Sequence, residues 1–108
     1  MEETNIIKDT LKEELQRNLR SQLVYFREIE ALPRGSLSVR LRRGRNYCYL
    51  KYRAGDKVVT DYVGPEERVG EKLKESIERR KALQESLKRL KREQAFIEKA
   101  LGRKRNAQ

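Results

Sequence analysis

The sequence has no histidine, no tryptophan and a single cysteine among its 108 residues. Without histidine, the chain cannot form the His-dependent nucleophilic, acid–base and zinc sites of many enzymes. The lone cysteine, Cys48, excludes an internal disulfide framework and is expected to be a small buried hydrophobe. Glycine-rich phosphate loops of the GxxxxGK[ST] or GxGxxG type are also missing. The sequence therefore predicts a protein that is not an enzyme and that uses no metal or cofactor.

Long apolar runs are absent as well. No stretch approaches the ~20 apolar residues of a membrane-spanning helix. The first residues, MEETNIIKDT, are acidic and lack the basic-then-apolar pattern of a signal peptide. We therefore expect a cytoplasmic protein with no membrane partner.

Positive charge is what the sequence has in excess. It contains 27 Lys and Arg against 17 Asp and Glu, which gives a formal net charge of +10. Such a charge favours polyanionic partners through counterion release and electrostatic steering. The apolar residues are strongly periodic, so the high charge indicates long exposed helices rather than disorder. The length supports a single domain over residues 1–108, with a modest core.

Two segments with a helical period flank the centre of the chain. Residues 3–31 repeat apolar side chains three and four apart, and Pro33 prevents the helix from continuing. Residues 66–101 predict a second, long helix that starts after Pro65, and residues 102–108 form a short basic tail. The long helix also has a seven-residue repeat, which is typical of coiled coils. Its two sets of core positions are Val69, Ser76, Leu83, Leu90 and Ile97, and Leu73, Arg80, Leu87, Gln94 and Leu101.

We expect the two helices to form an antiparallel coiled-coil hairpin within one chain. The first helix would cover the heptad stripe through four leucines spaced by four: Leu11, Leu15, Leu19 and Leu23. This spacing makes the stripe drift around the helix, so a tilted or supercoiled crossing is expected. The alternative is that either helix pairs with a copy of itself, so a monomer and a homodimer both remain open.

Residues 36–64 have a period of two and predict a three-stranded antiparallel meander, which makes the fold class α+β. Short glycine-containing turns separate the strands. For the first hairpin, a loop at Gly44-Arg45 keeps apolar and polar faces separate, whereas a slip by one residue mixes them. This register pairs Leu41 with Cys48, Val39 with Leu50, and Leu37 with Tyr52 on the apolar face, and Arg42 with Tyr47 and Arg40 with Tyr49 on the other. It predicts that Leu50 is buried against a helix. Apolar residues on both faces of the third strand leave the second register undetermined.

The polar face of this sheet combines basic and aromatic side chains. Arginine can bind phosphates or guanine edges, and tyrosine can stack on bases. The candidate nucleic-acid-binding residues are Arg40, Arg42, Arg43, Arg45, Tyr47, Tyr49, Lys51 and Arg53. The alternative is that Arg and Tyr pairs stabilise an exposed sheet and bind nothing. Lys88, Arg89, Lys91 and Arg92 form a second basic cluster, for which a solvated helix face is the favoured interpretation.

The run LPRGSLSVRLRRGRNYCYLKYRAGDKVVTDYVGPEE, with the charged helix after it, resembles a family of small bacterial and archaeal proteins that is a domain of unknown function. The shared pattern is LPxGS, YxYLxYR and YxG before a long helix, and it covers about residues 32–100. The strand–strand–strand–helix order is also similar to the arm-type DNA-binding domains of mobile-element integrases. That resemblance implies DNA contacts by the sheet residues Arg40, Arg42, Tyr47, Tyr49, Lys51 and Arg53.

The favoured function is therefore a non-enzymatic accessory or regulatory protein of a mobile element or phage that binds DNA or RNA through its basic–aromatic sheet face. One alternative is a protein-binding inhibitor or regulator of a nucleic-acid-handling complex. The other is a structural coiled-coil assembly protein.

Overall fold

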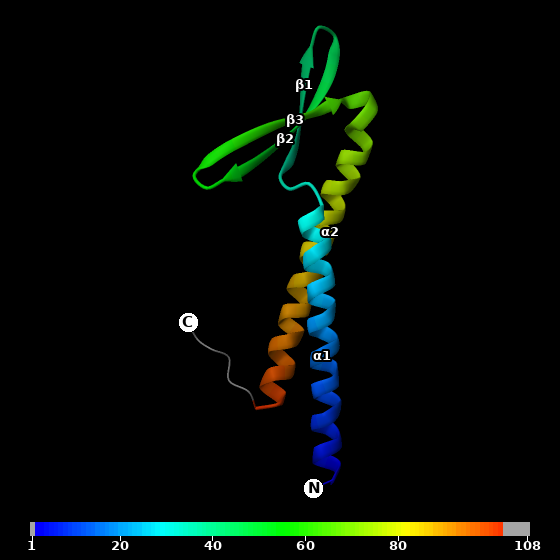
Figure 1. Ribbon diagram of the computed structural model, residues 1–108, viewed down its shortest axis with the longest axis vertical. Helices are drawn as coiled ribbons and strands as arrows, with labels where there is room; N and C mark the ends of the chain where they lie inside the picture. The colour runs from blue at the N-terminus through cyan, green and yellow to red at the C-terminus, as the bar shows by residue number, and fades with distance from the viewer. Residues whose placement is uncertain (1, 103–108) are drawn as a thin grey trace. The chain divides into compact units, whose positions relative to one another are not determined.

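The computed structural model describes the backbone of residues 2–102 and the side chains from Asn5 onward (Figure 1). It confirms the α+β class and the order of helix, three-stranded antiparallel sheet and long helix. The basic tail lies, apart from Gly102, outside the described residues. The elements are α1 (Glu2–Ala31), β1 (Ser36–Arg42), β2 (Arg45–Ala54), β3 (Lys57–Pro65) and α2 (Glu66–Ala100).

The chain divides into two compact units. One contains the residues up to Arg27 together with those from Gln84 onward, and the other is Glu28–Leu83. The first unit is a pair of helical segments and the second holds the sheet with the adjoining ends of both helices. That residues 1–108 form a single domain stays a prediction. None of the helices within residues 2–102 is long and apolar enough to cross a membrane.

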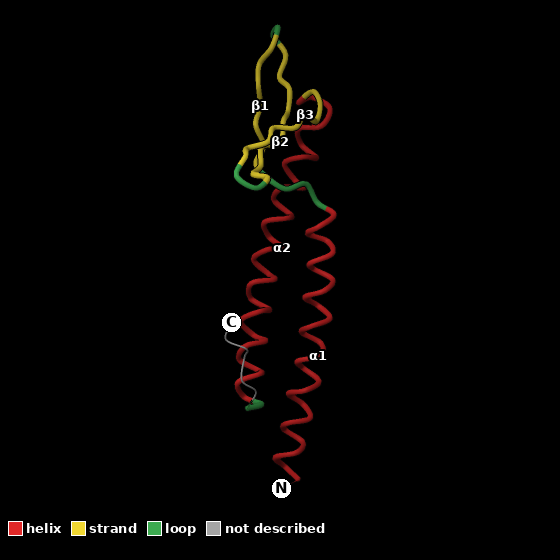
Figure 2. Tube along the Cα trace, turned by 60° about the vertical axis from the view of Figure 1, so that its left-hand side comes forward, coloured by secondary structure: helices red, strands yellow, loops and turns green. Residues whose placement is uncertain are grey.

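In the helical unit, α1 and α2 run antiparallel and side by side, which confirms the expected contact between the two helices (Figures 1 and 2). Leu15 and Ile97 are buried there. The prediction that Leu19 and Leu23 also cover α2 is wrong, because both are exposed, Leu23 by 48%. Each step of four residues advances about 40° beyond a full helical turn. Leu19 and Leu23 therefore rotate away from the contact in which Leu15 is buried.

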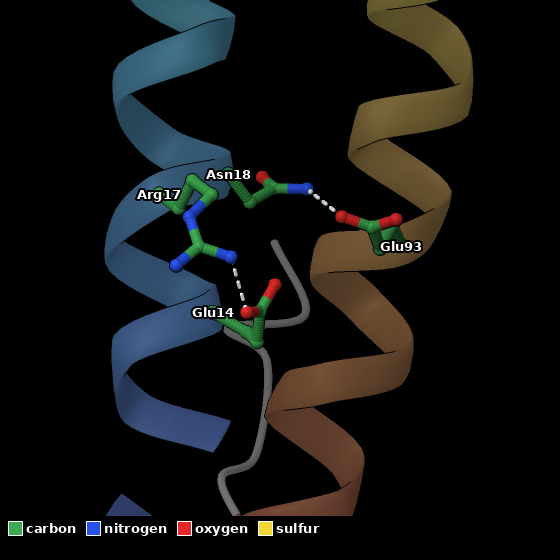
Figure 3. A network of polar contacts seen from close by, with 4 residues as sticks. All are labelled: Glu14, Arg17, Asn18 and Glu93. Atoms are coloured by element: carbon green, nitrogen blue, oxygen red, sulfur yellow. Dashed lines mark hydrogen bonds and ion pairs between the residues drawn. The ribbon is translucent and has the colours of Figure 1, made fainter. Parts of the chain in front are cut away.

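Asn18 lies in the contact between the two helices and is only 2% exposed. Its amide nitrogen donates to the Leu90 carbonyl oxygen at 2.9 Å and to a Glu93 carboxylate oxygen at 3.0 Å. Figure 3 shows the contact with Glu93 across the two helices, beside an Arg17–Glu14 pair along α1. Gln22 donates to the Asn18 side-chain oxygen at 2.7 Å and to Gln94 at 2.8 Å. A connected polar layer of this kind can fix the register of two helices.

The sheet has strand order β1-β2-β3, and its first hairpin is closed by Arg43 and Gly44. Both have positive φ, 52° and 75°, as the two central residues of a type I′ turn require. Leu37 consequently pairs with Leu50, and Val39 with Cys48. The predicted pairing of Leu41 with Cys48 is wrong, as is the predicted loop at Gly44-Arg45. The error is a slip by two residues, which leaves each side chain on its expected face because the strand period is two.

The second hairpin contains a β-bulge. Cys48 pairs with Gly64 whereas Tyr49 pairs with Tyr62, so Val63 is the extra residue on β3. A bulge interrupts the alternation of faces, which explains why apolar residues occur on both faces of this strand. Gly64 is buried, and a Cβ there would lie 3.2 Å from a methyl group of Val69.

One face of the sheet packs against the first part of α2. Cys48 has no exposed surface and forms the core of this unit with Leu73 and Ile77. Leu50 is half-buried and packs against this core. Burial raises the pKa of the Cys48 thiol, and the Glu66 carboxylate adds to the increase. Ile77 lies outside the predicted seven-residue repeat. This part of α2 packs against a sheet rather than a helix, so its buried positions need not follow a coiled-coil pattern.

Candidate nucleic-acid interface

The sheet face that points away from Cys48 and Leu50 is called the open face here. Its members follow from the strand register, since paired residues share a face. They are Ser36, Ser38, Arg40 and Arg42 of β1, Arg45, Tyr47, Tyr49, Lys51 and Arg53 of β2, and Val58, Thr60, Tyr62 and Pro65 of β3. No Asp or Glu stands on this face in the three strands, all of which the structure describes. Every charged side chain that the strands contribute to this face is therefore basic.

Three tyrosines gather on the open face, and we call Tyr47, Tyr49 and Tyr62 the tyrosine cluster. The Tyr62 ring centroid lies 5.5 Å from that of Tyr49, with the planes at 61°, and 6.2 Å from that of Tyr47. These spacings are typical of edge-to-face aromatic pairs. Tyr62 is nevertheless 58% exposed, so much of its ring surface remains accessible.

Tyr62 was not among the sequence-predicted site residues. The bulge after Tyr62 places it opposite Tyr49, and regular alternation alone gave no means of assigning its face. A glycine inside a strand often marks a bulge. Gly64 was therefore the sequence feature that could have indicated the irregular register.

Arginine side chains accompany the tyrosine cluster. The guanidinium carbon of Arg40 lies 4.8 Å from the centre of the Tyr49 ring, within the range of cation–π contacts. Arg42 and Arg43 line a shallow depression of about 430 Å³ together with all three tyrosines. Arg40, Arg42 and Arg43 are exposed. The structure thus brings together five of the eight predicted residues.

The other three predicted residues have different positions. Arg45 is paired with Glu67, with its Nε 2.8 Å from the carboxylate, and this hydrogen bond and charge raise the pKa of Arg45. Its guanidinium lies 5.9 Å from the Tyr47 ring centre, at the outer limit of a cation–π contact. Lys51 and Arg53 are exposed on the open face but do not line the depression.

The remaining strand tyrosine, Tyr52, lies on the opposite face, where both its hydroxyl and its ring have partners within the protein. Its hydroxyl donates to the Asp61 carboxylate at 2.7 Å, and the Arg34 guanidinium lies 4.6 Å from its ring centre. The hydrogen bond to Asp61 is the main reason that the pKa of Tyr52 is raised. Among the described residues, no group of His, Cys, Asp or Glu could hold a metal ion.

The second basic cluster, on α2, has the contacts of a solvated helix face. Lys88 lies 3.5 Å from Glu85, and Arg89 donates to Ser86 at 3.2 Å. All four of its basic residues are exposed, and no tyrosine cluster accompanies them in the described part of this helix.

The fold and this face define an α+β protein with a positively charged, tyrosine-containing sheet surface. A family model described as a domain of unknown function, DUF6788, matches residues 2–75, and the chain belongs to this family. The match begins with α1 and ends within α2. The resemblance expected from the sequence, over about residues 32–100, did not include α1. Comparison with curated proteins and with solved structures found no match.

Proposed function

We propose that this protein is a non-enzymatic accessory or regulatory protein that binds nucleic acid through the open face. The observation that supports this most is the tyrosine cluster framed by Arg40, Arg42 and Arg43 on a sheet face without a carboxylate. Exposed guanidinium groups contact phosphates without dependence on sequence, and exposed aromatic rings contact bases. The net charge of +10 adds long-range attraction to a polyanion.

Arg and Tyr pairs that only stabilise the sheet would account for the contact of Arg40 with Tyr49, but not for the lack of carboxylate partners on this face. Pairs that only stabilise a sheet can be satisfied by cross-strand partners of opposite charge. Here the arginines of β1 have no carboxylate on their own face, and among the strand arginines, all of which the structure describes, Arg45 alone is neutralised, by Glu67. An uncompensated cluster of positive charge destabilises the folded sheet through repulsion, and a bound polyanion would remove that cost.

The role in a mobile element or phage remains part of this proposal. It is supported by the strand–strand–strand–helix order shared with arm-type integrase domains, which is an analogy of architecture.

A protein partner is a second candidate, favoured by a separate observation in the helical unit. Leu19, Leu23 and Phe26 of α1 and Leu87 of α2 line a shallow, mainly apolar groove with Gln22 and Lys91. Exposed apolar patches of this kind often mark protein contacts. An accessory protein could therefore bind nucleic acid with one unit and a protein with the other.

Reversing two charges of the open face tests the proposal. We expect R40E/R42E to lower the affinity for a generic DNA duplex or single strand at least tenfold at physiological salt. The slope of log affinity against log salt should become shallower by roughly 1–2 units, since each lost phosphate contact removes about 0.9 on duplex DNA. Fluorescence anisotropy at several salt concentrations measures both quantities.

The matched control is K88E/R92E, which changes the net charge by the same amount on the exposed face of α2. We expect this variant to retain most of the affinity, because it leaves the open face intact. Equal losses in both variants would show that binding follows net charge alone, and unchanged binding by R40E/R42E would contradict the proposed interface.

A further inference from the structure

We infer that the open face takes unpaired bases, so that its preferred ligand is single-stranded nucleic acid rather than a duplex. This inference rests on the proposed nucleic-acid binding and adds the class of nucleic acid to it. The depression lined by Arg42, Arg43 and the tyrosine cluster is the proposed site.

The first argument concerns the surfaces that the tyrosines present. In a duplex the faces of the bases are covered by their neighbours, and only base edges are accessible in the grooves. A tyrosine ring can therefore stack only on a base that is unpaired or extruded. The 5.5 Å edge-to-face contact holds the Tyr62 ring against Tyr49 while leaving it 58% exposed, as a stacking surface requires.

The second argument concerns the shape of the site. A volume of about 430 Å³ is large enough for a base and lies within the range of small-molecule sites, about 300–1,000 Å³. Three of the residues that line it are tyrosines and the other two are arginines. A basic surface without aromatic rings would suffice for the phosphates of a duplex, whereas exposed tyrosines in a shallow depression are suited to a base.

The third argument concerns Arg43, which adopts φ 52° in the first hairpin turn. This left-handed conformation is common for Gly, Asn and Asp in type I′ turns and unfavourable for a long side chain. Residues in unfavourable backbone conformations concentrate at functional sites. The turn places Arg43 at the depression together with Arg42, where both can pair with the phosphates on either side of a stacked base.

Affinities for oligothymidylate, oligouridylate and a mixed-sequence DNA duplex, each of about 12 nucleotides, test the inference at one salt concentration. We expect Tyr62→Leu to weaken single-strand binding about tenfold or more and to change duplex binding by less than twofold. Tyr62→Phe retains the ring and should retain single-strand affinity. The two single strands distinguish DNA from RNA as the source of the unpaired base. Because the chain has no tryptophan, quenching of tyrosine emission on binding gives an independent measure of stacking.

Several outcomes would overturn the inference. If Tyr62→Leu weakens duplex and single-strand binding equally, or changes neither, the ring does not stack on bases. If the parent protein binds the duplex and neither single strand, the inference fails while the proposed function stands. If it binds none of the three probes, the proposed function fails as well. Far-ultraviolet circular dichroism and the thermal transition of each variant establish that it is folded, and Tyr49→Leu provides a second test of the same ring pair.

Discussion

Asn18→Asp should destabilise the protein by about 3–5 kcal/mol, the usual cost of an uncompensated buried charge. The Asn18 amide nitrogen is a donor to two acceptors, the Leu90 carbonyl oxygen and the Glu93 carboxylate. A carboxylate at this position would remove the donor and place a negative charge against both acceptors, at a site with 2% exposure. For a protein of this size, such a loss is a large fraction of the free energy of unfolding. Urea denaturation followed by circular dichroism measures it.

Asn18→Leu is the matched control, because it removes the same hydrogen bonds without adding a charge. Replacing a buried polar group by an apolar one of similar shape can be nearly neutral. We expect a change of about 1 kcal/mol or less, since Gln22 keeps its bond to Gln94 and Glu93 is exposed to water. If N18D is as stable as the parent, the helices do not enclose Asn18 as described.

Gly35→Ala is the second substitution for which we expect a large effect, about 2–4 kcal/mol of lost stability. Gly35 has φ 101°, and a methyl group there would lie 2.5 Å from the Lys51 carbonyl oxygen and 2.9 Å from the Tyr52 Cβ. Both neighbours belong to the middle strand β2, so the connection from α1 would have to move away from the sheet. Thermal unfolding should show a lower midpoint for this variant.

Gly55→Ala separates the two causes of this effect, which are the left-handed backbone conformation and the close approach to β2. Gly55 also has positive φ, 67°, but nothing lies within 4 Å of a Cβ built there. We expect a cost of about 1 kcal/mol, from the left-handed conformation alone. If both alanine variants lose the same stability, the close approach of Gly35 to β2 is not as described.

The sequence was sufficient to predict the elements and the faces of the strands, because both follow from periodicity. Period two places Cys48 and Leu50 on the core side and Tyr47 and Tyr49 on the other, whatever the turn. It could not determine the register, since a slip by two residues leaves every face unchanged. The turn at Arg43-Gly44 decides it, and an arginine is not an expected residue for a left-handed turn position.

Burial in the helical unit was harder to predict than helix formation. The spacing of the leucines by four predicts one stripe, but Asn18 and Gln22 occupy the contact with α2 while Leu19 and Leu23 are exposed. A hydrophobicity pattern treats a polar residue as exposed, although one with partners across the interface can be buried at low cost. Gln94 in the heptad was the sign of such a layer.

The candidate site was predicted in part. Arg40, Arg42, Arg43, Tyr47 and Tyr49 lie on or beside the open face because of strand alternation and the turn. Two features depend on contacts that no local pattern contains. The bulge adds Tyr62, and the pairing with Glu67 occupies Arg45.

The chemical shifts of the backbone amides during titration with a single-stranded oligonucleotide test the central claim most directly. The measurement needs no substitution and reports on every part of the chain at once. At physiological salt, we expect the largest changes at Arg40–Arg43, at Tyr47 and Tyr49, and at Tyr62. Changes concentrated at Lys88–Arg92 of α2, with the strand amides unaffected, would contradict the open face as the nucleic-acid-binding surface.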